Sequence, residues 1–545
     1  MTAPILVVGA GTTGLTMACE LARHGVPVRI VDKLASINPH CRATGIHSRT
    51  LEVFYDLGIV EEILARGNKV LGMSQYANGE RFMHSSGGEL DSPYPFVVML
   101  EQCKTEAALE GLLNRSGVEV ERETELIAIS ERPECVAATI RRPDGREEVV
   151  ETPWLIGCDG AHSRIRHLNH VHFPGDEDTR QYLIADVLMQ NTLAHDEVHN
   201  FLSDHGILMF FPLPNRRWLV AADVPTHHDA AREQPTLEEV QAIINQRGPG
   251  AVTISDPRWL TFFRINYRSV SHYRHSRVFL AGDASHIHSP FGGQGMNTGI
   301  QDAYNLAWKL ALVYRGRAPL SLLDSYEKER RPVAEDVVKT TRALTESLEV
   351  FSGLSPAERK RLFFDLAVPP EVAKRMALHN EELDLNYSKS PICRQHEGSH
   401  FGKTRFRAGP HPGQEALDAR PLLHAQGRPT TLFELLRGPK HTLLLFPGAW
   451  HEARSWQRLI DLAESVKVKA GDLIDTFFVA IEPGRVSPDP RLDGRVILDP
   501  ERSFHYRYGA ESECLYLIRP DGYIGYRSEP ATPSALHDYL GRIFL

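Results

Sequence analysis

The chain has 545 residues, more than one ordinary domain holds, so its length predicts two to four domains. Apolar residues make up 42% and charged residues 24%, which excludes a wholly disordered chain, and a net charge of −9 argues against a nucleic-acid partner. Seven cysteines without a CxxC pair argue against a disulfide framework, a dithiol redox site or a metal site.

The first motif lies near the start of the chain. An apolar run at residues 5–8 is followed by the glycine-rich turn at 9–14, a helical pattern to Arg23 and a second apolar run that ends at Asp32. This order predicts a βαβ unit and a doubly wound α/β domain. The glycines let the turn approach a pyrophosphate, and Asp32 lies where a carboxylate can accept hydrogen bonds from a ribose. A turn that only packs helix on strand is the alternative.

The next segments alternate between helical and sheet patterns. Residues 49–65 are helical in pattern, whereas 70–100 and 180–270 contain alternating apolar residues, which predict a more antiparallel sheet inserted into the α/β domain. Between them an apolar strand leads to Asp159, and Arg166 follows. This turn can orient a nucleotide or a flavin, with Arg166 neutralising a phosphate, or it can be an ordinary strand-to-helix turn.

The third motif covers residues 277–299. A buried strand ends at Gly282 and Asp283, and a loop rich in glycine leads into a long helix from Gln301 to Leu312. The Asp283 carboxylate can hold a polyol hydroxyl, and the backbone amides of the loop can reach a ring system at the start of the helix. So many glycines weaken a fold, so the loop is not expected to be merely structural.

The last part of the chain changes character. Residues 321–385 are helical and charged, and proline and glycine cluster at 407–413, as in a linker. Strand patterns at 442–446 and 477–481, then a hairpin around 515–525, predict a small thioredoxin-like α/β domain. No apolar run approaches the roughly 20 residues that cross a bilayer. We therefore expect a soluble cytoplasmic protein with no membrane partner.

The three motifs in this order resemble the group A FAD-dependent aromatic hydroxylases, the flavoprotein monooxygenases that include para-hydroxybenzoate and phenol hydroxylases. The resemblance covers residues 4–345 and implies a glutathione-reductase-type, Rossmann-like FAD-binding domain with an inserted mixed β-sheet substrate domain. It also fits a C-terminal thioredoxin-like domain that lacks CxxC. The expected parts are the FAD-binding domain (1–72, 96–178 and 270–345), the substrate-binding domain (73–95 and 179–269), a helical linker (346–400) and the thioredoxin-like domain (401–545).

The resemblance also implies roles for individual residues. The residues expected to bind FAD or NAD(P)H are Gly9, Gly11, Thr13, Gly14, Asp32, Lys33, Arg42, Gln102, Leu126, Asp159, Arg166, Asp283, Pro290, Gly293, Gly295, Met296 and Asn297. The family often has Glu at the Asp32 position, which is a mild departure. Arg42 is expected beside the mobile flavin, and Pro290 near its reactive carbon.

The family chemistry implies that NAD(P)H reduces FAD, that O₂ forms a flavin C4a-hydroperoxide, and that one oxygen atom passes to an electron-rich ring. His47 is the expected base for the phenol proton, because a neutral imidazole titrates near physiological pH. His47, Arg42, Pro290 and Tyr267 are therefore the expected catalytic residues. The expected substrate-binding residues are Met209, Phe211, Trp218, Arg264, Tyr267 and Phe291, and each has ordinary sheet packing as its alternative.

Other functions stay open at this point. A flavin-dependent halogenase needs a WxWxIP segment, which the sequence lacks. An FAD-dependent dehydrogenase or oxidase, a non-enzymatic FAD-binding regulator and a homodimer are all compatible with the motifs. The bulky Phe291 favours a substituted phenol over a polycyclic polyketide as substrate. The sequence does not separate NADPH from NADH.

Overall fold

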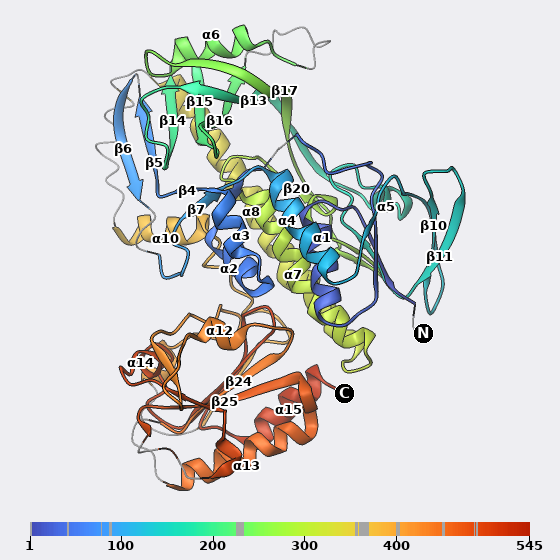
Figure 1. The fold of residues 1–545 in the computed structure, drawn as a ribbon, viewed down its shortest axis with the longest axis vertical. Coiled ribbons are helices and arrows are strands. Elements are labelled where there is room, and N and C mark those ends of the chain that lie inside the picture. Colours follow the sequence, from blue (N-terminus) through green and yellow to red (C-terminus); the bar gives the residue numbers. More distant parts are fainter. Residues whose placement is uncertain are drawn as a thin grey trace.

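Three sheet-containing regions follow one another along the long axis of the molecule (Figure 1). The computed structural model describes residues 3–40, 43–77, 79–86, 90–224, 234–354, 358, 370–398, 404–448, 453–483, 486 and 489–545. No helix within these residues combines the length and the apolar character that a membrane span requires.

The middle region is built on a six-stranded sheet in the order β18-β19-β12-β1-β2-β8. Its strands are β1 (Ile5–Val8), β2 (Val28–Val31), β8 (Val120–Glu121), β12 (Leu155–Gly157), β18 (Arg274–His275) and β19 (Val278–Leu280). All neighbours pair in parallel except β18, and β1, β12 and β19 are fully buried. Continuous apolar runs are typical of parallel strands covered on both faces, so the predicted βαβ opening is present.

Four helices pack around this sheet. They are α1 (Thr12–Arg23), α4 (Gln102–Arg115), the short α5 (Arg164–Leu168) and α7 (Gln294–Tyr314). Helices α1 and α7 lie in close contact because the Thr13 side chain fits against Gly282 and Gly299, where an added Cβ would lie 2.6 and 2.4 Å from its hydroxyl oxygen. The helix predicted from Gln301 therefore begins two turns earlier, at Gln294.

Two small sheets flank the middle region. One is the antiparallel β9-β10-β11 meander (Glu125–Glu131, Val136–Arg141 and Glu147–Thr152), and the other joins β3 (Gly45–Ile46), β7 (Val97–Met99) and β4 (Asn68–Val70). The helix expected over 49–65 is two helices, α2 (Ser48–Leu57) and α3 (Val60–Arg66). Gly58 separates them because its φ of +79° ends α2 in the left-handed conformation.

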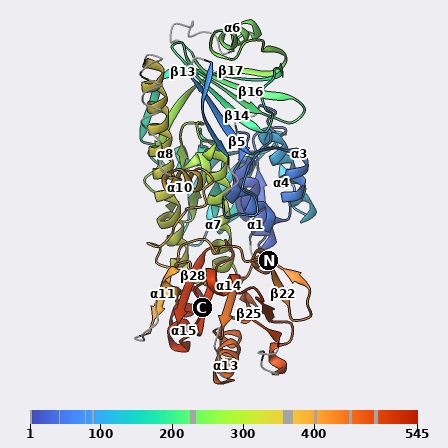
Figure 2. The ribbon, with the colours of Figure 1, turned by 90° about the vertical axis from the view of Figure 1, so that its left-hand side faces the viewer.

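The upper region is an eight-stranded sheet in the order β20-β17-β13-β16-β15-β14-β5-β6. Its strands are β5 (Gly72–Ala77), β6 (Glu80–Ser86), β13 (Gly175–Gln190), β14 (Glu197–Ser203), β15 (Gly206–Pro212), β16 (Arg217–Val224), β17 (Thr253–Ser269) and β20 (His286–Ile287). Helix α6 (Leu237–Arg247) packs on one face, and α8 (Asp324–Gly353) runs beside the sheet (Figure 2). Strand β20 belongs to the third motif, so this sheet reaches that loop.

The lower region is an eight-stranded mixed sheet in the order β21-β28-β27-β24-β25-β26-β22-β23. Its strands are β21 (Arg394–Glu397), β22 (Leu422–His424), β23 (Pro429–Thr430), β24 (His441–Phe446), β25 (Ile474–Ala480), β26 (Val496–Leu498), β27 (Cys514–Ile518) and β28 (Ile524–Glu529). Helices α13 (Ala453–Ala470) and α15 (Pro533–Ile543) pack on one face, and α11 (Thr404–Ala408), α12 (Leu432–Leu436) and α14 (Ser503–Arg507) on the other.

The segment expected to be a helical linker is more than a linker. Helix α8 runs on to Gly353, past the expected boundary, and α10 (Pro370–Asn380) follows. Strand β21 pairs in parallel with β28, so this segment also supplies an edge strand to the lower sheet. Trp308 and Leu312 of α7 join the apolar cluster under α13 and α15, so the lower region is packed directly on the middle one.

Candidate functional site

Two glycines of the turn between β1 and α1, Gly9 and Gly14, have no room for a side chain. A Cβ on Gly9 would lie 2.3 Å from the Cys158 carbonyl oxygen, and one on Gly14 would lie 1.8 Å from the Gly9 carbonyl oxygen. The Asp32 carboxylate accepts a hydrogen bond from the Ala10 amide at 2.6 Å, which ties the end of β2 to the turn. Gly11 precedes α1, and the nearest atom to a Cβ there is 3.8 Å away. The turn therefore presents open backbone at a helix N-terminus, which suits a diphosphate.

A buried acid, Glu106, lies beside this turn and was not predicted. Its Oε1 is the atom nearest to the position of a Cβ on Gly11, and it accepts a hydrogen bond from Gln102 Nε2 at 2.8 Å. Burial raises the pKa of Glu106 to about 7, and Cys103 and Asp32 add to the effect. The predicted residue Gln102 is thus oriented by an acid that is partly protonated at neutral pH.

The second motif, around Asp159 and Arg166, is hydrogen-bonded to the third motif at residues 277–299. Asp159 accepts hydrogen bonds from the amides of Arg164 and Ile165 at 2.6 and 3.1 Å, at the start of α5. Arg166 donates to the carbonyls of Ala161 and Ala284 at 2.6 and 3.0 Å and is almost fully buried. That Arg166 neutralises a phosphate stays a prediction, and in this structure backbone carbonyls already hold its guanidinium.

Buried side chains of α7 and α8 hold the turn that follows β19 in the third motif. The short 3₁₀ helix Gly282–Ala284 follows β19, and Asp302 of α7 accepts from the Gly282 amide at 3.0 Å and from His286 Nε2 at 2.8 Å. Arg330 of α8 donates to the other oxygen of Asp302 at 2.7 Å. These groups are buried, whereas Asp283 is exposed on the opposite side of the turn. Asp283 therefore faces the surface where the resemblance expects the ribityl chain.

Hydrogen bonds of Asn297 connect the glycine loop ahead of α7 to β3. Gly293 has a left-handed φ of +68°, and Asn297 Nδ2 donates to the carbonyls of Gly293 and Gly45 at 2.8 and 3.0 Å. The side-chain oxygen Oδ1 of Asn297 accepts a hydrogen bond from the His47 backbone amide at 3.0 Å. Pro290 is exposed and Gly295 half-buried, while Met296 is buried in the core. The predicted residues of this loop therefore lie together at the N-terminus of α7.

His47 lies beside this loop but faces an acid. It directly follows β3 and precedes α2. Its Nδ1 is 3.7 Å from Glu381 Oε1, and its Nε2 is next to Gly293, where a Cβ would lie 3.1 Å away. Glu381, Glu382 and the Gly293 backbone raise the pKa of His47 against the effect of burial. A raised pKa favours the protonated ring, which cannot accept the phenol proton, and this argues against the expected role of His47.

Four of the predicted substrate residues share one apolar cluster. Met209, Phe211, Tyr267 and Phe291 pack on the face of the upper sheet turned away from α6. Phe291 makes an edge-on contact with Tyr182 at 5.4 Å between ring centroids. Phe291 is thus packed into the sheet, so its bulk no longer argues for a small substrate.

The Tyr267 hydroxyl is one of two tyrosine hydroxyls in this cluster, the other being that of Tyr182. It is buried and makes no hydrogen bond of normal length within the described residues. Burial raises the pKa of Tyr267, although the hydroxyls of Thr345 and Ser289 oppose the shift. Ser289 directly precedes Pro290, and it accepts a hydrogen bond from Thr345 of α8 at 3.1 Å. Tyr267 therefore brings a phenolic donor to the base of the Pro290 loop.

Two predicted substrate residues point elsewhere. Trp218 packs in the cluster under α6, with its ring 5.0 Å from that of His195. Arg264 has a side chain that is 57% exposed, and it pairs with Glu177 at 3.5 Å. Side chains alternate between the two faces of a strand, so Arg264 lies opposite its neighbour Ile265, which belongs to the Tyr267 cluster. The strand register sets the face that each side chain occupies, and the substrate roles of Trp218 and Arg264 stay predictions.

A further imidazole, His288, was not predicted. Its Nδ1 lies 2.9 Å from the Ser289 carbonyl oxygen, and its buried Nε2 has no hydrogen-bond partner in the described residues. Burial lowers the pKa of His288 to about 4, so the ring stays neutral. Since Nε2 is the atom nearest to a Cβ on Gly295, at 3.6 Å, the ring borders the glycine loop.

The remaining predictions lie at the edge of the site. Lys33 is exposed beside Asp32, and Leu126 of β9 is buried in the core of the middle region. Arg42 lies outside the described residues.

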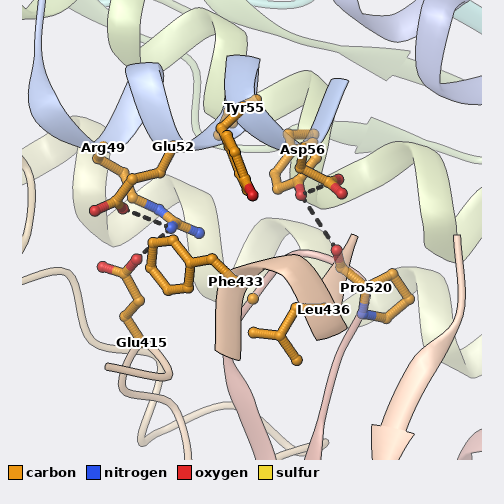
Figure 3. A pocket seen from close by; sticks show the side chains of 11 residues that line it. Arg49, Glu52, Tyr55, Asp56, Glu415, Phe433, Leu436 and Pro520 are labelled. Carbon is orange, nitrogen blue, oxygen red and sulfur yellow. Dashed lines mark hydrogen bonds and ion pairs between the residues drawn. The ribbon is translucent and has the colours of Figure 1, made fainter. Parts of the chain in front are cut away.

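A small cavity between the middle and lower regions is not a substrate site. It lies between α2 and the lower region, with Arg49, Tyr55 and Asp56 facing Glu415 and Pro520 (Figure 3). Its volume of about 30 Å³ has space for one or two waters and not for an aromatic ring.

Comparisons with known proteins place this geometry in a family. A family model described as "FAD binding domain" matches residues 2–341. The 6-methylpretetramide 4-monooxygenase of Streptomyces rimosus is 34% identical over 97% of this chain and 92% of its own length. Pentachlorophenol 4-monooxygenase of Sphingobium chlorophenolicum is 30% identical over 96% of this chain and 94% of its own. The solved structure of the flavin-dependent monooxygenase PieE, in complex with FAD and substrate, matches with a TM-score of 0.81 at 23% identity, over 99% of both chains.

Proposed function

The chain belongs to the FAD binding domain family and is an FAD-dependent monooxygenase that uses NAD(P)H, and on this premise we propose that it hydroxylates a phenolic ring. The proposed site lies between the Pro290 loop and the apolar sheet face that carries Tyr267. One observation carries the proposal: the buried Tyr267 hydroxyl, which makes no hydrogen bond of normal length within the described residues, next to Ser289 at the base of that loop.

The residues present fit FAD. The turn at Gly9–Gly14 would hold the diphosphate, because Gly9 and Gly14 admit no side chain, Gly11 leaves open space, and a helix N-terminus favours an anion. Asp32 would meet the adenosine ribose, and the exposed Asp283 the ribityl chain. The isoalloxazine would lie along the loop from Pro290 to Gly293. When bound, the flavin supplies the activated oxygen that is transferred to the ring.

The protein's own contribution is to bind, orient and exclude water. Met209, Phe211 and Phe291 provide the apolar wall that favours an aromatic ring and keeps water out. The raised pKa of Tyr267 keeps its hydroxyl protonated, so Tyr267 would donate a hydrogen bond to the phenolic oxygen. The neutral ring of His288 offers the acceptor that His47 does not, because its Nε2 is without a partner in the described residues.

A polycyclic phenol is the second candidate substrate. The relative from Streptomyces rimosus that is 34% identical over almost the whole chain is named for a reaction on 6-methylpretetramide. In addition, Phe291 contacts Tyr182 within the sheet and leaves the original argument for a small ring without support. Both candidates share the phenolic oxygen that Tyr267 would bind, and they differ only in the length of apolar face that they cover.

For the rest of the chain, we infer that residues 401–545, together with β21, form a thioredoxin-like domain without a redox function. Helices on both faces of a mixed sheet and the absence of CxxC support this inference. The other inferred parts keep their bounds: 1–72, 96–178 and 270–345 for FAD, and 73–95 with 179–269 for substrate. A small aromatic substrate and O₂ are the proposed partners, in the cytoplasm.

Turnover with a panel of phenols tests the proposal. Purified protein with FAD is supplied with NADH or NADPH and with single-ring or polycyclic phenols, and H₂O₂ and product mass are measured. We expect phenol-stimulated NAD(P)H oxidation and a product that is heavier by one oxygen atom. Tyr267→Phe is expected to raise KM about tenfold, the cost of one hydrogen bond. A wild-type KM in this variant would remove Tyr267 from the site.

A further inference from the structure

The segment that follows α10 reaches into the middle region and contacts two of its helices. Glu381 Oε2 accepts hydrogen bonds from the Ser48 amide and hydroxyl, both at 2.9 Å, at the start of α2. Glu382 has a φ of +58° and turns the opposite way, accepting from the Thr298 hydroxyl of α7 at 3.2 Å. Two consecutive acids therefore enter between α2 and α7, behind the glycine loop.

The two acids differ in charge. Burial raises the pKa of Glu382, and its neighbours lower it only in part. In contrast, His47 and the two Ser48 donors hold the pKa of Glu381 below its usual value despite burial. The pKa of His47 is raised by Glu381 and, less, by Glu382, the two titratable groups that act on it. The directions agree with the geometry, in which Glu381 Oε1 lies 3.7 Å from His47 Nδ1, within the distance of an ion pair.

The other side of the His47 ring borders the glycine loop ahead of α7. Its Nε2 borders Gly293, and the Gly293 backbone is among the groups that raise the pKa of His47. The His47 amide also donates to Asn297, the residue that holds the Gly293 carbonyl. Gly293 adopts its left-handed conformation within this frame. The imidazolium is therefore fixed between a carboxylate and the loop.

We propose that Glu381 is a positioning residue for the glycine loop ahead of α7: through the His47 ring it fixes Gly293 and the start of α7 in the conformation that binds FAD. The inference rests on FAD binding, not on the identity of the aromatic substrate. It gives the segment between the middle and lower regions a role in cofactor binding that its distance in the sequence does not suggest. The charge of the pair carries the effect, since an amide at position 381 keeps the shape and the Ser48 contacts.

The test is FAD binding by Glu381→Gln across pH, with Asp384→Asn as the matched control. Asp384 lies in the same segment, and its carboxylate contacts only the half-exposed His379 among the ion pairs of the described residues. In Glu381→Gln we expect a tenfold higher FAD dissociation constant below the pKa of His47. In ¹³C-His NMR of the apo-protein, the His47 titration midpoint should fall by about one pH unit. The control should match the wild type in both.

The pH profile separates positioning from a general loss of structure. Wild-type FAD affinity should weaken as pH rises through the His47 midpoint, and in Glu381→Gln that weakening should move to lower pH or vanish. If Glu381→Gln folds poorly, His47→Gln and the double variant decide the matter, because Glu381→Gln should add nothing once the imidazole is gone. Wild-type affinity and an unmoved His47 midpoint in Glu381→Gln, or a full additional loss in the double variant, would overturn the proposal. Neither result depends on whether a phenol is hydroxylated.

Discussion

Helix α7 is buried and polar at two places, and the two differ in what satisfies the polar groups. At its N-terminus, next to the glycine loop, the Tyr267 hydroxyl and His288 Nε2 have no hydrogen-bond partner in the described residues. Further along, Lys309 and Asn305 meet Glu329 of α8, whose two carboxylate oxygens accept five hydrogen bonds in all. Buried polar groups are almost always satisfied, so the unsatisfied end marks the face for ligands and the saturated stretch marks a permanent interface.

The acids of the two regions make the same contrast. Beside the dinucleotide turn, burial raises the pKa of Glu106 to about 7 because the nearest cation, Arg122, has only a small effect. At the interface with the lower region, Arg519 and Lys309 hold the pKa of Glu329 far below its usual value, although it is even more deeply buried. Burial alone makes an acid hold its proton, and cations within hydrogen-bond distance reverse the effect. The two acids therefore differ in their immediate partners: Arg519 and Lys309 bind Glu329, whereas Glu106 accepts its hydrogen bond from Gln102.

The largest effect is expected at the joint. Arg519 is buried and binds Glu329 at 2.8 and 2.9 Å as well as Asp521, so Arg519→Ala leaves two buried carboxylates without their main partner. We expect a loss of about 3–5 kcal/mol in the free energy of unfolding, measured by chemical denaturation of the full chain. Lys440→Ala is the control, because its pair with Asp475 is exposed and should contribute less than about 1 kcal/mol. Equal losses in the two variants would mean that the joint is not special.

The second prediction compares two glycines of the same turn. Gly14→Ala would place a Cβ 1.8 Å from the Gly9 carbonyl oxygen, so it should destabilise the apo-protein as well as abolish FAD binding. Gly11→Ala meets no atom closer than 3.8 Å, so the apo-protein should keep its stability. Its methyl group would instead enter the space that a diphosphate needs, and FAD affinity should fall about a hundredfold or more, roughly 3 kcal/mol. Thermal unfolding of apo-protein and FAD titration separate the two. Tight FAD binding by Gly11→Ala would move the diphosphate away from this turn.

The sequence predicted the backbone of the site better than its side chains. The glycine turn, the βαβ unit and a long helix from Gln301 follow from local periodicity and from glycines at fixed spacing, and they are present, although the helix begins at Gln294. Glu381 could not be predicted, because its partner His47 is more than 300 residues away and no local pattern links them. The placement of the Trp218 and Arg264 side chains could not be predicted for a different reason. Their strands were expected, but which face each side chain occupies depends on the register against α6 and the loop.

The third prediction concerns Glu106, the buried acid beside the dinucleotide turn. With a pKa near 7, Glu106 is protonated below neutral pH and becomes an anion as pH rises, beside the turn that would hold a diphosphate. FAD affinity should therefore weaken above about pH 7, by up to about tenfold for each pH unit. Asp32 and Cys103 also raise this pKa, and Arg122 lowers it, so these three must stay unchanged in the variants compared. Glu106→Gln should bind FAD with less dependence on pH. An unchanged profile would assign the dependence to another group, His47 first.

The smallest expected effect separates the two faces of the upper sheet. Met209 lies on the face shared with Tyr267 and Phe291, and Trp218 lies on the face under α6. Met209→Ala should change KM for the aromatic substrate severalfold, whereas Trp218→Phe should leave KM unchanged and lower only the stability, by about 1–2 kcal/mol. Steady-state kinetics with the best phenol of the panel and thermal unfolding measure both quantities on the same samples. Because the two residues lie on adjacent strands, a shift of KM in Trp218→Phe that equals the shift in Met209→Ala would mean that the face under α6, not the Tyr267 face, holds the ring.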